Sequence, residues 1–254
     1  MEKLRIVILA AGRSKRMHNE ELPKVLIKLH DRPIISYLLE AVQRSKLDKR
    51  PVVVVGWQAG LVIQTLGNQN DYIVQNELLG TGHAVLQTKN FLQNKAENIM
   101  VLYGDHPYLK PESIKKLAQI HIDQGHTLSL MTLRVSNFKG QYRFFDNFGR
   151  IIRGEAGKIK EIVEKNDASP EQLKIKEVNP AYYCFKGEWL WENLEKIKNN
   201  NIQGEYYLTD LVKMAIDQGY RIDSIDIDPK EAIGINTPEH LELARKQEIG
   251  PDPY

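Results

Sequence analysis

Three cations follow the first apolar stretch of the chain within four positions. The segment ILAAGRSKRM, residues 8–17, passes from apolar side chains through Gly12 to Arg13, Lys15 and Arg16. A cluster of cations in a turn is usually a solvated surface feature. The alternative is an anion site, in which backbone N–H groups of a glycine turn and nearby cations hold phosphate. The segment lacks the glycines of a dinucleotide fingerprint or a Walker A loop, so neither motif explains it.

Two further side chains could act on a phosphate or on its counter-ion. Lys24 in LPKVL (22–26) can serve as a point charge on phosphate, and Asp105 in YGDHP (103–107) follows a strongly apolar run. Magnesium at phosphate sites is typically held by one or two carboxylates and by substrate oxygens, so Asp105 is a candidate ligand. The competing interpretations are a surface lysine and a helix-capping aspartate. His106 has no histidine partner at metal-ligand spacing, so we expect it to be structural or exposed.

A glycine-rich segment could receive a flat or anionic ligand. In NELLGTGHAV (76–85), Gly80 and Gly82 flank Thr81, which permits close backbone approach at a helix start. Gln75, just before it, carries the donor and the acceptor needed to bind the imide edge of a uracil.

Apolar runs predict the strands that position these side chains. They cover residues 4–10, 50–56, 71–75 and 98–104, and they alternate with helix candidates at 33–44, 58–66, 81–92 and 111–124. Runs that are apolar throughout, without alternating polar residues, indicate strands buried on both faces, as in a parallel sheet covered by helices. The carboxyl ends of such strands lie on one edge, where α/β proteins bind ligands. We therefore expect the candidate residues to meet at that edge.

The pattern changes after residue 135. Turn signals at 146–147 and 154–157 separate short strands, which predicts a β-rich insertion. Helices are then expected at 187–198, 209–218 and 238–248, with a strand near 221–227. No linker or repeat divides the chain. We expect one α/β domain over 1–254, a Rossmann-like, mostly parallel sheet flanked by helices, with a nucleotide-binding half (1–135) and a second half (136–254).

Composition excludes several other classes of protein. The 254 residues carry a net charge of +2, too near balance for a chain that binds nucleic acid, and 42% of them are hydrophobic, which predicts a folded core. The single cysteine, Cys184, rules out an intrachain disulfide and reads as a small buried side chain on a strand. The first apolar run is too short for a secretory signal, and no stretch is long enough to span a membrane. We expect a cytoplasmic protein with no membrane partner.

A series of motifs resembles a known family over nearly the whole chain. In order they are LAAGRSKRM, LPKVL, LGTGHAV, VLYGDHP, IVEKNDAS, EVNPAYYCF, NNNIQGEYYLTD and GINTPEHL. Their order and rough spacing resemble the nucleotidyltransferase half of the bacterial N-acetylglucosamine-1-phosphate uridylyltransferases. The resemblance implies a nucleotide-diphospho-sugar transferase fold. It also implies the Mg²⁺-dependent reaction of UTP with a sugar 1-phosphate, which gives UDP-sugar and pyrophosphate.

The resemblance also implies a role for each matching residue. The triphosphate would contact Ala11, Gly12, Arg13, Arg16 and Lys24, and the uracil would contact Gln75, Gly80 and Thr81. Magnesium would bind Asp105 and Asn236, and the catalytic set would be Arg16, Lys24 and Asp105. The sugar side would comprise Gly149, Glu164, Asn179, Tyr207 and Thr209, where the competing interpretation of Tyr207 and Thr209 is a buried tyrosine and a helix cap.

The chain departs from the family pattern in its first loop and on the sugar side. Ser14 and Lys15 stand where the family has glycine and threonine, and Phe148 stands where it commonly has tyrosine. The family's Asn-Thr-Gly is Asn-Pro-Ala here, through Pro180 and Ala181. We expect a tighter sugar pocket with one backbone donor fewer.

These residues favour one mechanism and leave several functions open. We expect in-line attack of a sugar phosphate oxygen on the α-phosphorus, catalysed by positioning and charge stabilisation, with N-acetylglucosamine 1-phosphate as substrate. The alternatives are glucose 1-phosphate or another hexose 1-phosphate, a cytidylyltransferase on the same fold, and a regulatory module that binds nucleotide or sugar without catalysis. The bifunctional members of the family continue into a hexapeptide-repeat acetyltransferase. No such repeat occurs in this sequence, so we expect no acetyl transfer.

Overall fold

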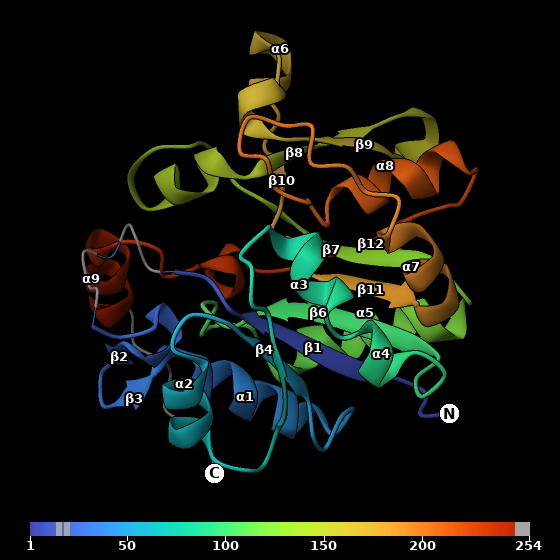
Figure 1. Cartoon of the computed structure of the whole chain (residues 1–254). Coiled ribbons are helices and arrows are strands. Elements are labelled where there is room, and N and C mark those ends of the chain that lie inside the picture. The colour runs from blue at the N-terminus through green and yellow to red at the C-terminus, as the bar shows by residue number, and fades with distance from the viewer. Residues whose placement is uncertain (14–16, 18–20, 247–254) are drawn as a thin grey trace.

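The computed structural model describes residues 1–13, 17 and 21–246 of the chain. Within these residues ten strands form one sheet, in the order β5-β4-β1-β6-β11-β7-β10-β8-β9, with β12 paired to β7. Figure 1 shows this sheet running through the molecule, with β8, β9 and β10 at the top. The strands are β1 (Arg5–Ala10), β4 (Val52–Val55), β5 (Asp71–Val74), β6 (Asn98–Tyr103), β7 (Leu128–Arg134), β8 (Gly149–Arg153), β9 (Ile159–Val163), β10 (Glu177–Asn179), β11 (Tyr183–Lys186) and β12 (Asp223–Asp226). A separate hairpin joins β2 (Lys28–Leu29) to β3 (Arg32–Pro33).

The parallel part of the sheet is built from the four predicted apolar runs. β1 pairs in parallel with β4 and with β6, and β4 pairs in parallel with β5. All four residues of β4 are completely buried, as expected for a strand covered on both faces. β11 then pairs with β6 and β7 in the antiparallel direction, and β8, β9 and β10 add antiparallel pairs. The predicted α/β class and the β-rich second half are confirmed.

Helices cover both faces of the sheet. They are α1 (Ile34–Ser45), α2 (Ala59–Leu66), α3 (Thr81–Leu86), α4 (Lys89–Leu92), α5 (Pro111–Asp123), α6 (Pro170–Leu173), α7 (Gly187–Leu194), α8 (Asp210–Asp217) and α9 (Pro238–Lys246). The buried side chains of α1, α2 and α5 pack into one apolar core, and those of α3, α4, α7 and α8 pack into a second core on the other face. A third, smaller core joins α9 to the β2–β3 hairpin, at the left of Figure 1.

Two predicted helices have the wrong length. The single helix expected over 81–92 is two helices, because the chain breaks at Thr88. The Thr88 side chain is fully buried, and its hydroxyl donates to the Val85 carbonyl at 2.7 Å, a local bond that competes with the helical pattern. The helix expected over 187–198 ends at Leu194, beside the buried Asn193, whose side-chain amide donates to the Trp189 carbonyl.

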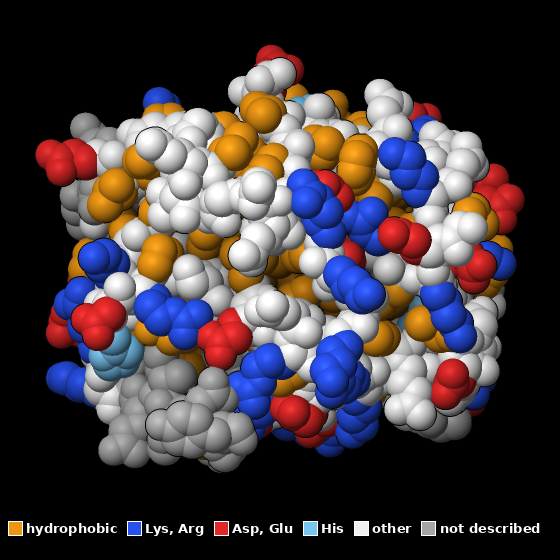
Figure 2. All heavy atoms as spheres, turned by 90° about the horizontal axis from the view of Figure 1, so that it is seen from below, with side chains coloured by type: hydrophobic (Ala, Val, Ile, Leu, Met, Phe, Trp, Pro, Cys, Tyr) orange, Lys and Arg blue, Asp and Glu red, His pale blue; other side chains and the backbone are white. Residues whose placement is uncertain are grey.

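Two properties of the surface and the core follow the composition. Lysine and arginine side chains stand beside acidic ones on the face at the bottom of Figure 1, which Figure 2 presents to the viewer. Cys184 is buried on β11, as predicted. None of the described helices combines the length and the apolar character of a membrane-spanning segment.

Candidate active site

Three residues from distant parts of the sequence meet at the carboxyl end of β6. The Lys24 ammonium donates to Asp105 Oδ2 at 2.6 Å and to Asn236 Oδ1 at 2.8 Å. Lys24 begins a 3-10 helix, Lys24–Leu26, behind Pro23, whereas Asp105 lies in the turn after β6. The backbone N–H of Ile235 donates to the Asp105 carbonyl at 2.9 Å, which holds Asn236 beside Asp105. Asp105 is therefore an ion-pair partner and not a helix cap.

The charge on Asp105 is set by its neighbours. Burial would raise the pKa of this carboxyl group, but the Lys24 ammonium, His106 and hydrogen bonds lower the pKa more, to about 2. Asp105 is thus ionised throughout the neutral range while only about a tenth of its side chain is exposed. Such a buried carboxylate needs a cation beside it. In the structure that cation is Lys24.

The same two oxygen atoms fit a divalent cation. Asp105 Oδ2 and Asn236 Oδ1 converge on one point, which the ammonium occupies, and both are the hard oxygen donors that Mg²⁺ prefers. Over the residues that the structure describes, no cluster of three or more histidine, cysteine or acidic side chains could hold a metal. A cation at Asp105 and Asn236 would complete its coordination with water and phosphate oxygens, the usual arrangement for Mg²⁺.

The predicted uracil-side residues lie together beyond β5 and at the start of α3. Gly80 has φ +104°, and a Cβ there would lie 2.8 Å from the Tyr206 carbonyl oxygen, so only glycine fits. Thr81 Oγ1 accepts from the Leu208 backbone N–H at 3.1 Å. Gln75 is buried, and its amide nitrogen lies 3.2 Å from the Gly80 carbonyl oxygen and 3.0 Å from His83 Nδ1. The bond between Thr81 and Leu208 holds the segment before α8 against the start of α3.

The first loop is described only up to Arg13 and at Met17. Ala11 is buried and Gly12 and Arg13 are exposed, whereas Arg16, Ser14 and Lys15 lie outside the described residues. The Arg13 guanidinium lies 5.7 Å from the centre of the Trp57 ring, which is within cation–π range. Trp57 follows β4 and was not singled out by the sequence. Its position directly after the run VVVVG is the signal that could have found it.

Three predicted sugar-side residues meet at one end of β8 and β9. Gly149 begins β8 and Glu164 follows β9, and a Cβ at Gly149 would lie 3.5 Å from Glu164 Oε1. Burial raises the pKa of Glu164, and a hydrogen bond from Thr209 opposes this rise. Thr209 precedes α8 without making a side-chain capping bond, so its hydroxyl serves Glu164 rather than the helix. Burial and nearby acidic groups raise the pKa of Tyr207, which is partly exposed.

The Asn179 side chain closes the turn between β10 and β11, which contains Pro180 and Ala181. Asn179 Oδ1 accepts from the Ala181 backbone N–H at 2.9 Å, and Asn179 Nδ2 donates to the Tyr183 hydroxyl at 2.6 Å. Ala181 has φ +66°, a left-handed conformation that favours glycine. The amide of Asn179 is thus largely committed to the turn itself.

Tyr103 lies between Thr81 on the nucleotide side and Asp105, and the sequence analysis missed it. Burial raises the pKa of its phenol, and a hydrogen bond with Thr81 opposes the rise. Tyr103 is the last residue of β6, two positions before Asp105. This placement at a strand end is the signal that could have found it.

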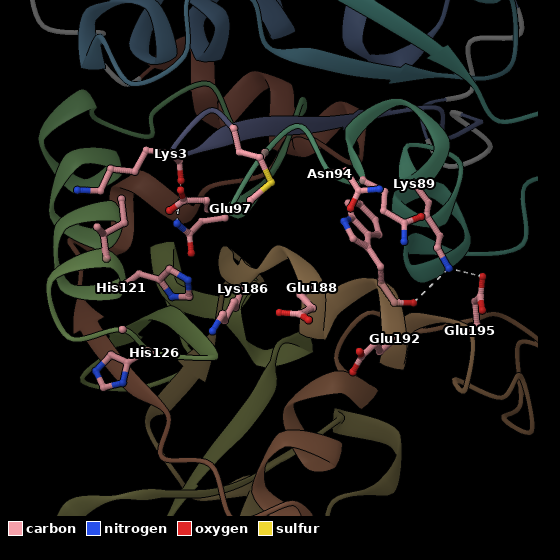
Figure 3. A pocket seen from close by; sticks show the side chains of 17 residues that line it. Lys3, Lys89, Asn94, Glu97, His121, His126, Lys186, Glu188, Glu192 and Glu195 are labelled. Atoms are coloured by element: carbon pink, nitrogen blue, oxygen red, sulfur yellow. Dashed lines mark hydrogen bonds and ion pairs between the residues drawn. The ribbon is translucent and has the colours of Figure 1, made fainter.

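A separate cavity of about 960 Å³ lies near the amino ends of β1 and β6 and is not part of this site. None of the described site residues lines it. Figure 3 shows its charged side chains, among which Lys89 is bound to Glu195 at 2.6 Å. Lys3 and Lys186 share the cavity with Glu97, Glu188 and Glu192. Because the lining carries both positive and negative side chains, it favours neither an anionic nor a cationic ligand.

Comparisons with known proteins show which family the chain is similar to. The family model for nucleotidyl transferase matches residues 5–229. The chain is 38% identical over 232 residues to the bifunctional protein GlmU of Clostridium acetobutylicum, covering 91% of this chain and 49% of that protein. It is 36% identical over 247 residues to the GlmU protein of Desulfotalea psychrophila, covering 96% of this chain and 70% of that one. The chain spans about half the length of several of the curated relatives that it matches, such as 49% of the Clostridium acetobutylicum protein and 52% of the GlmU protein of Acetivibrio thermocellus.

Solved structures share the fold at low sequence identity. A UDP-glucose pyrophosphorylase complexed with UDP-glucose superposes with a TM-score of 0.78 at 18% identity, covering 96% of this chain and 97% of that one. A CMP:2-keto-3-deoxy-manno-octonic acid synthetase complexed with CTP superposes with a TM-score of 0.69 at 16% identity, covering 96% and 97%. The shared architecture matches the predicted fold class.

Proposed function

We propose that this chain, which belongs to the nucleotidyl transferase family, is a sugar-1-phosphate uridylyltransferase that joins UTP to N-acetylglucosamine 1-phosphate and releases pyrophosphate. The observation that carries the proposal is the convergence of Lys24, Asp105 and Asn236 at the carboxyl end of β6. An ammonium and two oxygen ligands at one point suit the charges of a triphosphate and its counter-ion.

The mechanism needs position and charge rather than a protein nucleophile. A sugar phosphate oxygen attacks the α-phosphorus in line with the departing pyrophosphate, so the protein must hold two anionic substrates together. Lys24 balances Asp105 in the free protein and moves to the phosphates when the substrates bind. Arg13, and Arg16 from outside the described residues, would add positive charge for the departing pyrophosphate. Magnesium held by Asp105 and Asn236 would supply charge neutralisation at the reacting phosphates.

The remaining predicted residues would orient the two substrates. Gly80 and Thr81 would receive the base against the backbone, with Gln75 reading the imide edge. Glu164 would accept hydrogen bonds from sugar hydroxyls, with Thr209 fixing its carboxylate. Because Asn179 spends much of its amide on the turn, we assign it chiefly the role of shaping the sugar pocket.

The second candidate substrate is glucose 1-phosphate or another hexose 1-phosphate. Ala181 favours it, because the methyl group occupies a position where glycine would leave space for an acetamido group. The turn is nevertheless closed by a hydrogen bond from the Ala181 backbone N–H to Asn179 Oδ1. A methyl-sized obstruction discriminates by only about 1–3 kcal/mol, so N-acetylglucosamine 1-phosphate stays the favoured substrate.

The test is pyrophosphate release over four nucleoside triphosphates and several sugar 1-phosphates with Mg²⁺. We expect turnover to be greatest with UTP and N-acetylglucosamine 1-phosphate, and to be lost in Asp105→Asn but kept in the matched control Asp123→Asn, which changes an exposed aspartate of α5. Faster turnover with CTP would indicate a cytidylyltransferase. Nucleotide binding without pyrophosphate release would indicate a non-catalytic module.

A further inference from the structure

His106 is buried between the loop that carries Asn236 and the turn between β10 and β11. We propose that it is a positioning residue which fixes Asn236 through one end of its ring and the β10–β11 turn through the other. The proposal rests on the proposed function, because it assigns His106 the role of holding the cation-binding loop and the sugar-binding turn of that site at a fixed distance from each other. The competing interpretation is a core histidine that only stabilises the fold.

The Nδ1 end of the ring binds Tyr182. His106 Nδ1 lies 2.6 Å from the Tyr182 hydroxyl, which in turn lies 2.9 Å from the Glu231 carbonyl oxygen. A carbonyl oxygen can only accept, so the single phenolic proton is spent on Glu231. Tyr182 must therefore accept from His106, which places the imidazole proton on Nδ1. Tyr182 is fully buried and directly follows Ala181, so this bond anchors the sugar-side turn.

The Nε2 end of the ring packs against the loop that carries Asn236. A Cβ on Gly234 would lie 2.5 Å from His106 Nε2 and 2.6 Å from His106 Cδ2. No side chain fits between the ring and this backbone, so the imidazole supports the loop directly. The backbone N–H of the next residue, Ile235, donates to the Asp105 carbonyl. The loop before Asn236 is thus held by the His106 ring and by the backbone of Asp105.

The two ends of the ring can be separated by substitution. In His106→Asn the side-chain amide reaches the place of Nδ1 and keeps the bond to Tyr182, but nothing remains beside Gly234. In Tyr182→Phe the imidazole stays, while both bonds of the tyrosine hydroxyl, with His106 Nδ1 and to the Glu231 carbonyl, are lost. The control Tyr72→Phe removes a similar pair of bonds, because the Tyr72 hydroxyl accepts from Asn70 Nδ2 at 3.3 Å and donates to the Gly67 carbonyl at 2.7 Å.

The proposal predicts that each of these variants changes a different quantity. For Tyr182→Phe we expect KM for the sugar 1-phosphate to rise roughly five- to tenfold, the scale of the net free energy of buried hydrogen bonds, with an unchanged dependence on Mg²⁺. For His106→Asn we expect the Mg²⁺ concentration that half-saturates UTP binding, measured by calorimetry without turnover, to rise by a similar factor. KM for the sugar phosphate should stay near its native value. Tyr72→Phe should change neither quantity.

A merely structural histidine would give a different result. Both variants would then lower the unfolding temperature and shift the two quantities together or not at all, and that outcome overturns the proposal. If His106→Asn does not fold, His106→Gln serves instead, because its longer amide reaches the Nε2 place and abandons Tyr182. His106→Gln should reproduce the sugar-side change of Tyr182→Phe, and an unchanged sugar KM in a folded protein would overturn the proposal.

Failure of the proposed function is distinguishable from failure of this inference. If the native chain binds UTP with Mg²⁺ but turns over no sugar phosphate, the proposed function fails. The Mg²⁺ dependence of UTP binding in His106→Asn then decides the inference, an unchanged dependence overturning it.

Discussion

Removing the ammonium of Lys24 tests the centre of the proposed site. The variant Lys24→Met keeps the length of the side chain but leaves the buried Asp105 carboxylate beside Asn236 without its cation. The matched control is Lys28→Met, which changes an exposed lysine of β2.

The size of the effect follows from the pKa of Asp105. Its pKa is lowered from 3.8 to about 2 in the folded protein, where burial opposes the shift and Lys24 is the largest favourable cause. One pKa unit corresponds to about 1.4 kcal/mol, so the shift stabilises the folded state by about 2 kcal/mol. This contribution is fully present above pH 3.8 and is lost as the pH falls through about 2. We expect Lys24→Met to lose about 2 kcal/mol of unfolding free energy at neutral pH, or about 4–8 °C in Tm.

The pH dependence of the difference has a definite sign. Without Lys24, burial raises the pKa of Asp105. As the pH is lowered, the carboxylate of the variant therefore takes up a proton, and the cost of burying an unpaired negative charge disappears. The gap between native and variant stability should therefore narrow as the pH is lowered from neutrality toward about 4, near the ordinary aspartate pKa. Urea unfolding of both proteins across this range measures it.

Magnesium and turnover supply two further measurements on the same variant. Mg²⁺ without nucleotide must compete with the ammonium in the native protein, but it finds both oxygens free in Lys24→Met. We expect Mg²⁺ to raise the Tm of the variant more than that of the native protein, and kcat/KM to fall roughly 100-fold or more. A variant within about 0.5 kcal/mol of native stability, the usual range for surface substitutions, with an unchanged response to Mg²⁺ would refute the assigned ion pair.

Three other substitutions test separate parts of the site. Asp105→Asn should lower turnover by orders of magnitude in a folded protein, as circular dichroism and pyrophosphate release would show; near-native turnover would remove Asp105 from the site. Ala181→Gly relieves a left-handed alanine, worth about 1–2 kcal/mol, against about 0.4–1 kcal/mol of added chain entropy in the unfolded state, so its unfolding free energy should equal or slightly exceed the native value. Its kcat/KM should also gain for N-acetylglucosamine 1-phosphate relative to glucose 1-phosphate, and no gain would mean that Ala181 does not set the choice. Trp57→Ala removes the ring beneath Arg13 and should raise KM for UTP about two- to fivefold at constant kcat, whereas an unchanged KM would show that the cation–π contact does not hold Arg13 for the nucleotide.

The sequence predicted best the strands whose side chains are buried on both faces of the sheet, whichever strands lie beside them. The runs that became β1, β4 and β6 are apolar on both faces, so any parallel sheet covered by helices would bury them. From their parallel order it followed that Asp105 would lie on the ligand edge. The motifs supplied the remaining candidates by resemblance. Local pattern failed at Thr88, because the bond that ends α3 depends on a side chain whose burial comes from the rest of the fold.

The contacts that define the site were decided by the tertiary structure. Lys24 and Asn236 are 212 positions apart, and no local pattern states that they share a partner in Asp105. Likewise, the insertion of antiparallel β11 between β6 and β7 brings Tyr182 to His106, and the turn before it forces φ +66° on Ala181. Periodicity and residue type report which side chains favour burial or charge, because those preferences belong to each residue and its near neighbours. Which side chains face one another depends on how distant strands pair, and that pairing is settled only when the whole sheet closes around its two cores.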